Sequence, residues 1–317
     1  MRQRVILLAA EMMNRYCSFA LFAVVAFAPR ADSQTPPQSY LFSANVDLVV
    51  LNATVHDHKG WCVANLTESD FAVYEDSVQQ RIKLFRHEDI PVTVGLVVDH
   101  SRSMRPKLPE VIAAARVFAQ SSRPDDSMFV VNFNEYVTLE LPNATHHNNT
   151  PDQLALAIAS RPADGKTALY DAVVEAVEQL QVGTPEKKVL IIVSDGGDNA
   201  SKHSLAQLLT LLEKSNALVY TIGLFSDDDP DSNPAVLRRL AHISGGEAFF
   251  PRELNEVVAI CEQIAADIRN QYTIGYASSN AEQSGSFRAI RLVAHAAGDG
   301  KLSVRTRSGY IAGEAAK

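Results

Sequence analysis

Five oxygen-bearing side chains in three short segments could together bind a metal ion. An apolar run ends on Asp99, and Ser101 and Ser103 follow it at alternate positions (LVVDHSRSM). Thr167 lies in DGKTALYDA, and Asp195 closes the run in VLIIVSDGGDN. Carboxylates and hydroxyls are ligands that hard cations prefer, and the set offers neither nitrogen nor sulfur. The sequence therefore predicts a divalent-cation site, with Mg²⁺ as the expected ion and Mn²⁺ or Ca²⁺ as alternatives.

The charge of this ligand set indicates what the ion could do. Two carboxylates neutralise a divalent ion, and the three hydroxyls add no further negative charge. An ion held in this way stays electrophilic, so it can accept another oxygen from water or from a carboxylate on a second molecule. We therefore expect a protein partner that offers an Asp or Glu side chain to complete the coordination.

Two apolar strands must bring the two aspartates to the same place. Residues 92–98 and 189–193 are continuous apolar runs, typical of parallel strands that are buried on both faces. Asp99 and Asp195 follow these runs, and ligands of open α/β sheets bind at the carboxyl ends of the strands. If the two strands are neighbours, both carboxylates open into one crevice.

The alternation of patterns predicts the fold class. Residues 90–270 alternate between strand and helix, which favours an α/β domain with a doubly wound, mostly parallel sheet. Residues 41–89 and 271–312 have β patterns. We expect these flanking strands to form one β-sandwich-like domain into which the α/β domain is inserted. An independent C-terminal hairpin pair is the alternative. Among the individual elements expected are strands at 137–141 and 287–294 and a helix at 205–214.

The first residues resemble an export signal. Arg2 and Arg4 precede an apolar core at 18–28, which is too short for a comfortable membrane span. Residues 1–31 are therefore expected to be a signal peptide and 32–40 a linker, in a secreted or periplasmic protein. An uncleaved N-terminal anchor is the alternative. Removal of the leader changes the net charge from −8 to about −11, which argues against nucleic acid and anionic membranes as partners.

The three metal-binding segments together resemble a known motif. Asp-x-Ser-x-Ser at 99–103, followed by Thr167 and Asp195, is similar to the metal-ion-dependent adhesion site of von Willebrand factor A domains. The resemblance implies a Rossmann-like fold and a protein-binding function. It also implies that the two serines bind the metal directly and that the threonine does so in the high-affinity state. The two aspartates would act largely through water.

The flanking sequences resemble a narrower group, bacterial secreted proteins with a von Willebrand A-related domain. The similarity lies in LTESDFAVYED at 66–76 and in RTRSGY at 305–310. With these flanks, the likeness covers roughly residues 41–312.

Charged residues beside the site form a candidate partner-binding rim. Arg102 stands where a small residue is common in the family, and such a cation could repel a metal or help to receive an acidic ligand. The acidic residues Asp227, Asp228 and Asp229 follow an expected strand at 218–224, which places them at the same edge of the sheet. They lack an EF-hand pattern. A solvated loop is one interpretation of this run, and a rim that sets partner specificity is the other.

Two other functions stay open. A hydrolase could use the metal as a Lewis acid on phosphate esters, and only His100 is obvious as its general base. A structural envelope component could use the metal merely to stabilise the fold. The sequence has no phosphate-binding loop and no nucleophile elbow, so we expect a binding module rather than an enzyme.

The cysteines and the scattered histidines are not expected to bind metal. Cys261 shares one helical face with apolar residues, which predicts a buried thiol. A disulfide between Cys62 and Cys261 is the alternative in an oxidising compartment. His56 and His58 lie in a turn-like segment without the spacing of a zinc site, so we expect them at the surface.

Overall fold

The computed structural model describes residues 48–87, 89–141, 150–182, 187–225, 230–280, 282, 285–295 and 301–313. The expected signal peptide and linker lie outside these residues, as do Asp227, Asp228 and Asp229. All the described elements belong to one compact unit, residues 46–317. Among the described helices, none combines the length and the apolar character that a membrane crossing requires.

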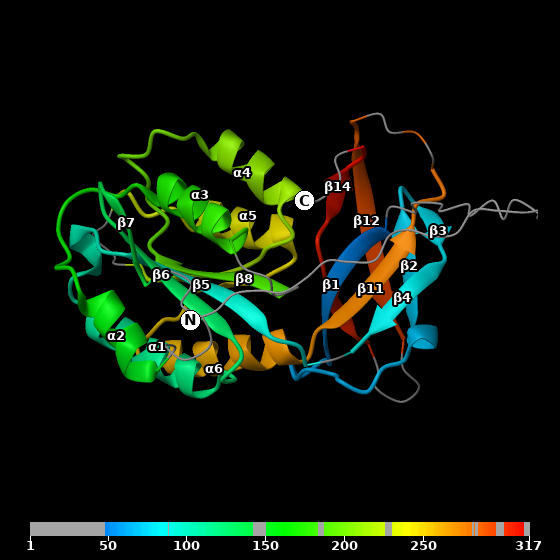
Figure 1. Cartoon of the computed structure of the whole chain (residues 1–317), viewed down its shortest axis with the longest axis horizontal. Coiled ribbons are helices and arrows are strands. Elements are labelled where there is room, and N and C mark those ends of the chain that lie inside the picture. The colour runs from blue at the N-terminus through cyan, green and yellow to red at the C-terminus, as the bar shows by residue number, and fades with distance from the viewer. Residues whose placement is uncertain are drawn as a thin grey trace, which may run out of the picture. The chain divides into compact units, whose positions relative to one another are not determined.

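A six-stranded sheet forms the centre of the α/β domain (Figure 1). In spatial order its strands are β10 (Ala248–Phe249), β9 (Leu218–Gly223), β8 (Lys187–Ser194), β5 (Val92–Asp99), β6 (Ser127–Phe133) and β7 (Val137–Leu141). Each neighbouring pair is parallel except β6 and β7, which form an antiparallel hairpin. β5 and β8 pair directly, with Val98 opposite Val193. The two strands that lead to Asp99 and Asp195 are therefore neighbours.

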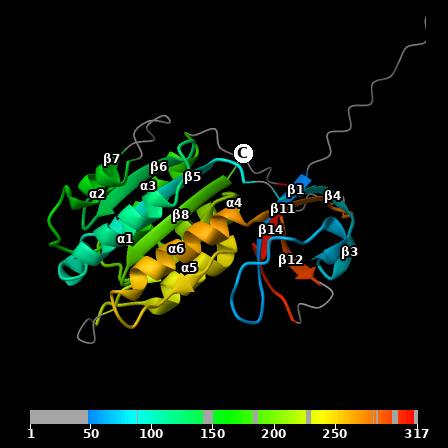
Figure 2. The ribbon, with the colours of Figure 1, turned by 90° about the horizontal axis from the view of Figure 1, so that it is seen from below.

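Helices cover both faces of this sheet. One face carries α1 (Leu108–Gln120), α2 (Pro151–Ala159) and α6 (Glu256–Arg269), and the other carries α3 (Leu169–Leu180), α4 (Leu205–Lys214) and α5 (Pro234–Ser244). Figure 2 shows α1 and α6 side by side across their face. Each face of the sheet has its own apolar core. Strands such as β5 contribute side chains to both cores, since they are buried along their whole length.

Two antiparallel sheets contain the remaining described strands. One has the order β13 (Ser303–Arg305), β1 (Leu48–His56), β11 (Tyr272–Ala277) and β4 (Ile82–Arg86). The other has the order β14 (Gly309–Ile311), β12 (Phe287–Ala294), β2 (Phe71–Glu75) and β3 (Val78–Gln80). The two sheets share one apolar core, as in a β-sandwich. Both mix strands from before and after the α/β domain. The predicted fold class is thus confirmed, and the independent C-terminal hairpin pair is wrong.

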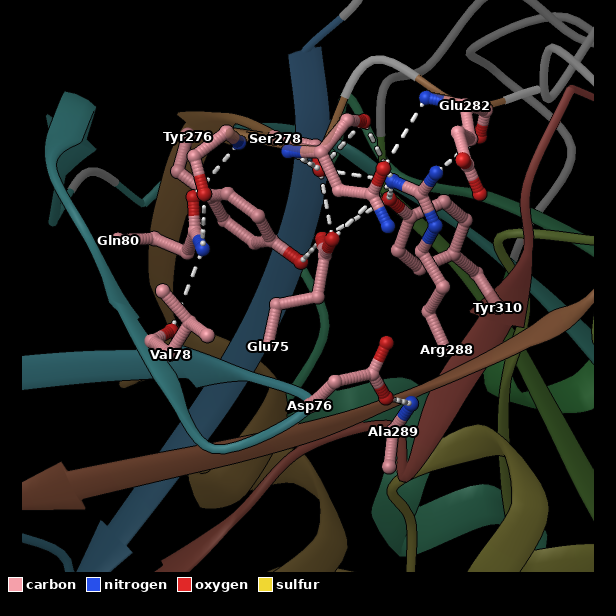
Figure 3. Close-up of polar contacts among 12 residues, drawn as sticks. Glu75, Asp76, Val78, Gln80, Tyr276, Ser278, Glu282, Arg288, Ala289 and Tyr310 are labelled. Atoms are coloured by element: carbon pink, nitrogen blue, oxygen red, sulfur yellow. Dashed lines mark hydrogen bonds and ion pairs between the residues drawn. The ribbon is translucent and has the colours of Figure 1, made fainter.

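A buried ion pair lies inside the sandwich, between two neighbouring strands of one sheet. Glu75 of β2 and Arg288 of β12 are almost inaccessible to solvent and lie 3.1 Å apart. The carboxylate of Glu75 also accepts hydrogen bonds from Tyr276 of β11, from Ser278 and from Tyr310 of β14 (Figure 3). Burial by itself raises the pKa of Glu75, but these hydrogen bonds outweigh it and lower the pKa overall. The carboxylate of Glu75 is therefore charged and held by hydrogen bonds from strands of both sheets of the sandwich.

Candidate metal site

Asp99 lies at the carboxyl end of β5 and has no solvent-exposed surface. Its Oδ1 accepts a hydrogen bond from the Ser101 backbone N–H at 2.7 Å, and its Oδ2 accepts one from Ser194 Oγ at 2.7 Å. These bonds fix the carboxylate between its own loop and the neighbouring strand β8. Burial, together with the negative charge of Asp195, raises the pKa of Asp99 to about 7.

The hydroxyls of Ser101 and Ser103 lead from this loop to Asp195. The two Oγ atoms are 3.2 Å apart, and Ser103 Oγ donates a hydrogen bond to Asp195 Oδ2 at 2.5 Å. A short 3₁₀ helix, η2 (Arg102–Met104), begins directly after Ser101 and holds both serines in one turn. Asp195 follows the last residue of β8 and is also buried. Oxygens from the loops after β5 and β8 are thus in direct contact.

Two glycines allow the loop after Asp195 to pass close to another backbone segment. Gly196 has a φ of +80°, and a Cβ there would lie 2.4 Å from the carbonyl oxygen of Asn233. At Gly197 a Cβ would lie 2.9 Å from the carbonyl oxygen of Asp231. The backbone N–H of Asn233 in turn donates to the carbonyl oxygen of Asp195 at 2.9 Å. Side chains at the two glycines would push these segments apart and displace Asp195.

Thr167 approaches this edge from the loop that precedes α3. It is 7% exposed, and its backbone N–H donates to Asn199 Oδ1 at 3.0 Å. Its carbonyl oxygen accepts a hydrogen bond from the Asn199 N–H at 2.9 Å. Because Asn199 belongs to the loop after β8, these bonds attach Thr167 to the loop that carries Asp195. Within the described part of the chain, the Thr167 hydroxyl makes no hydrogen bond.

Ser194 and Asn199 support the site but were not singled out from the sequence. Ser194 Oγ connects Asp99 to the β8 loop, since it donates to Asp99 and accepts from the Gly196 N–H at 3.0 Å. Asn199 fixes Thr167 through both its side chain and its backbone. The only signal for Ser194 is a hydroxyl at the end of a buried strand. Its hydrogen-bond partner, Asp99, is set by the pairing of β5 with β8. That pairing cannot be predicted from the spacing of residues in the sequence.

The sequence model of the von Willebrand factor type A domain matches residues 93–263, which include all five predicted ligands. The chain belongs to this family. A search among curated proteins finds none that matches the sequence.

Several solved structures are similar to this chain at low sequence identity. A von Willebrand factor type A protein from Catenulispora acidiphila is 14% identical with a TM-score of 0.50, and the match covers 85% of this chain and 75% of that chain. The corresponding domain of the type V pili tip protein Mfa5 from Porphyromonas gingivalis is 13% identical with a TM-score of 0.47, covering 56% and 94%. An aerotolerance-related membrane protein from Bacteroides fragilis is 15% identical with a TM-score of 0.44, covering 56% and 98%. These likenesses concern the fold alone.

Arg102 and His100, the residues on either side of Ser101, have different surroundings. The Arg102 side chain is 77% exposed, and its Nε lies 3.1 Å from Asp164 Oδ1. His100 is buried, beside Asn132 and the backbone of Arg161. Burial lowers the pKa of His100, so its ring is neutral at physiological pH. Arg102 is therefore paired with an acid at the surface, and His100 is uncharged.

Proposed function

We propose that this protein is an exported, metal-dependent protein-binding module. Asp99, Ser101, Ser103, Thr167 and Asp195 would hold a Mg²⁺ ion, and a carboxylate of a protein partner would complete its coordination. The observation that carries this proposal is the contact between the hydroxyls of the β5 loop and the Asp195 carboxylate of the β8 loop. Mn²⁺ or Ca²⁺ would suit the same oxygens. Export rests on the apolar leader in residues 1–31.

The electrostatics of the two carboxylates fit a divalent cation. Asp99 and Asp195 are both buried, and the charge of Asp195 contributes to the raised pKa of Asp99. A divalent ion between them would replace this repulsion by attraction and would favour the ionised form of Asp99. The serine and threonine hydroxyls add neutral oxygens, so the ion would keep its affinity for one more negative ligand.

The surface beside the site suits an acidic partner better than chemistry on a bound substrate. Arg102 places an exposed guanidinium next to the two serines, and charges at the rim of an interface steer complementary partners. Asp164, also exposed, holds Arg102 in the free protein. The hydrolase alternative has less support, because His100, its candidate base, is buried among groups outside the metal ligands.

Calorimetric titration of Mg²⁺ into the chelator-stripped full chain tests the metal site. We expect binding by the wild type, and Asp99→Asn and Ser103→Ala should each weaken it by more than about tenfold, the loss that even an outer-shell substitution can cause. Asp198→Asn is the matched control, because Asp198 lies in the same loop but its carboxylate is occupied by the Tyr170 N–H and Ser201. Equal affinities in the three variants would disprove the ligand assignment.

The role of the partner carboxylate has a separate test. An Asp-containing peptide should raise the affinity for Mg²⁺, and Mg²⁺ should raise the affinity for the peptide by the same factor, because coupling between two ligands is reciprocal. The peptide with Asn in place of Asp is the control. Metal binding without any such coupling would leave the structural role of the metal as the better explanation.

A further inference from the structure

A second group of metal-binding side chains lies away from Asp99, where β1 ends near α6. It consists of His56, Cys62 and Asp267, whose ligand atoms all lie within 4.8 Å of one another. His56 Nε2 is 2.9 Å from Asp267 Oδ1, Cys62 Sγ is 3.0 Å from the same oxygen, and Sγ is 3.5 Å from Nε2. His56 was expected at the surface, and this expectation is wrong, since the residue is 7% exposed.

A short hairpin places the imidazole and the thiol together. His56 and Cys62 form an antiparallel β-bridge, and residues directly opposite in such a pair present their side chains on one face. The Asp57 carboxylate closes the turn between them by accepting the N–H groups of Lys59 and Trp61 at 2.8 and 2.9 Å. The segment HDHKGWC therefore positions two of the three donors locally.

Asp267 completes the group from α6 and has no solvent-exposed surface. Its Oδ1 faces His56 and Cys62, whereas its Oδ2 accepts a hydrogen bond from Arg305 Nη2 at 2.6 Å. Carboxylates that bind metal ions are commonly oriented by such an outer partner. Arg305 Nη2 is also 3.2 Å from both ring nitrogens of His56, so the same guanidinium contacts two of the three candidate ligands.

The arrangement differs from a Cys–His–Asp relay for nucleophilic catalysis. In a relay, the imidazole uses one nitrogen for the nucleophile and the other for the carboxylate. Here Cys62 Sγ and Asp267 Oδ1 both face Nε2 of His56, and the thiol contacts the carboxylate directly. Three donors that converge in this way suit a metal ion placed between them.

We propose that His56, Cys62 and Asp267 bind a Zn²⁺ ion, at a site separate from the one around Asp99. Imidazole, thiolate and carboxylate are the usual ligands of Zn²⁺, whereas Mg²⁺ prefers oxygen alone. Binding would release the thiol proton to solvent, because the thiolate is the ligand. Three protein ligands leave one tetrahedral position, and Cys62 is only partly buried, so water can reach it. The ion would connect the β1 hairpin of the sandwich to α6 of the α/β domain.

Co²⁺ is the probe for this site, because a tetrahedral Co²⁺–thiolate complex absorbs visible light and has a sulfur-to-metal charge-transfer band. The full chain would be stripped with chelator, reduced, and titrated in excess Mg²⁺ to fill the site around Asp99. A Cys17→Ser background removes the cysteine outside the described residues. We expect both absorption features with Co²⁺, and their loss when Zn²⁺ displaces it. A folded wild type without the charge-transfer band would overturn the proposal.

Variants assign the band to these residues. Cys62→Ser should abolish it, and His56→Gln should weaken Zn²⁺ binding by more than about tenfold while a weaker thiolate band remains. Cys261→Ser is the matched control, since this buried thiol packs in the core beside α1 and should leave the band unchanged. Asp99→Asn should also leave it unchanged, which separates this site from the Mg²⁺ site. A charge-transfer band that persists in Cys62→Ser would disprove the assignment. Circular dichroism checks the fold of each variant.

Discussion

At Asp99, a proton and the proposed divalent cation would compete for one buried carboxylate. Its pKa is raised to about 7, by burial first and by the charge of Asp195 second. Near neutral pH the metal-free carboxyl therefore keeps a proton in a large fraction of molecules. The proposed metal ion would have to displace that proton, so metal binding and protonation at this residue would be linked.

The raised pKa predicts how the stability of the metal-free protein depends on pH. The folded state binds a proton more tightly than the unfolded chain, whose Asp pKa is near 3.8, so stability falls as the pH rises from about 4 to about 7. Each unit of pKa difference corresponds to about 1.4 kcal/mol of unfolding free energy. Urea denaturation in chelator should show this decline in the wild type and not in Asp99→Asn. Parallel pH profiles for the two proteins would contradict it.

Individual residues could be predicted where their role depends on local sequence. The proposed oxygen ligands could be selected from the sequence because strand ends and spacing are local, and Cys261 is buried as its helical face predicts. The alternative disulfide with Cys62 is not formed, since both thiols are free. His56 was misplaced because its burial depends on Asp267, which is 211 residues away in the chain.

Among the elements, β5 carries Asp99 and depends on a glycine in its middle. A Cβ on Gly95 would lie 2.3 Å from Phe129 Cζ on β6 and 2.7 Å from Leu190 Cδ2 on β8. Both neighbouring side chains are fully buried, so neither can move into solvent. The absence of a side chain at position 95 therefore allows the flanking strands to fill the core below α3.

Gly95→Ala should destabilise the protein by about 1–3 kcal/mol, the usual cost of overpacking a core. The cost should be smaller in a Phe129→Leu background, because the ring atoms that meet the new methyl group are then gone. Urea denaturation of the wild type, both single variants and the double variant measures this coupling. Strictly additive changes would show that the Phe129 ring is not what limits position 95.

Elements with clear periodic patterns were predictable, whereas two of the very short strands were not. The structure confirms the strands at 137–141 and 287–294 and the helix at 205–214. β3 and β14 have three residues each, too few for a pattern to emerge, and exist through pairing with β2 and β12. The turn between β2 and β3 has positive φ at Asp76 and Ser77, but this pair lacks the Asn-Gly signal of such hairpins.

For the whole molecule, the decisive feature is that the sandwich needs both flanks of the α/β domain. Leu48 of β1 pairs with Ala277 of β11, and Val73 of β2 pairs with Leu292 of β12. The β character of both flanks predicted that they combine. The partner of each strand could not be predicted, because these contacts join residues separated by the entire α/β domain.

A truncation after Asn270 should therefore unfold the N-terminal strands while the α/β domain stays folded. It removes β11 to β14, so the apolar side chains of β1 and β2 lose the strands that cover them. Limited proteolysis with mass spectrometry should show rapid cleavage within residues 48–86 and a resistant fragment near 90–270. Equal protection of 48–86 in the truncated and intact chains would show that these strands fold alone.

The pairing of β4 with β11 also determines how mechanical load passes along the chain. The chain leaves the sandwich after β4 and returns to it at β11, and these two strands are hydrogen-bonded neighbours. When the polypeptide is pulled through the segments before β1 and after β14, the sandwich strand pairs therefore bear the tension. The loop of chain from 92 to 269, with the three segments of the proposed Mg²⁺ site, lies outside that line of force. A bond at Asp99 and its neighbours would keep its geometry while the rest of the chain is stretched.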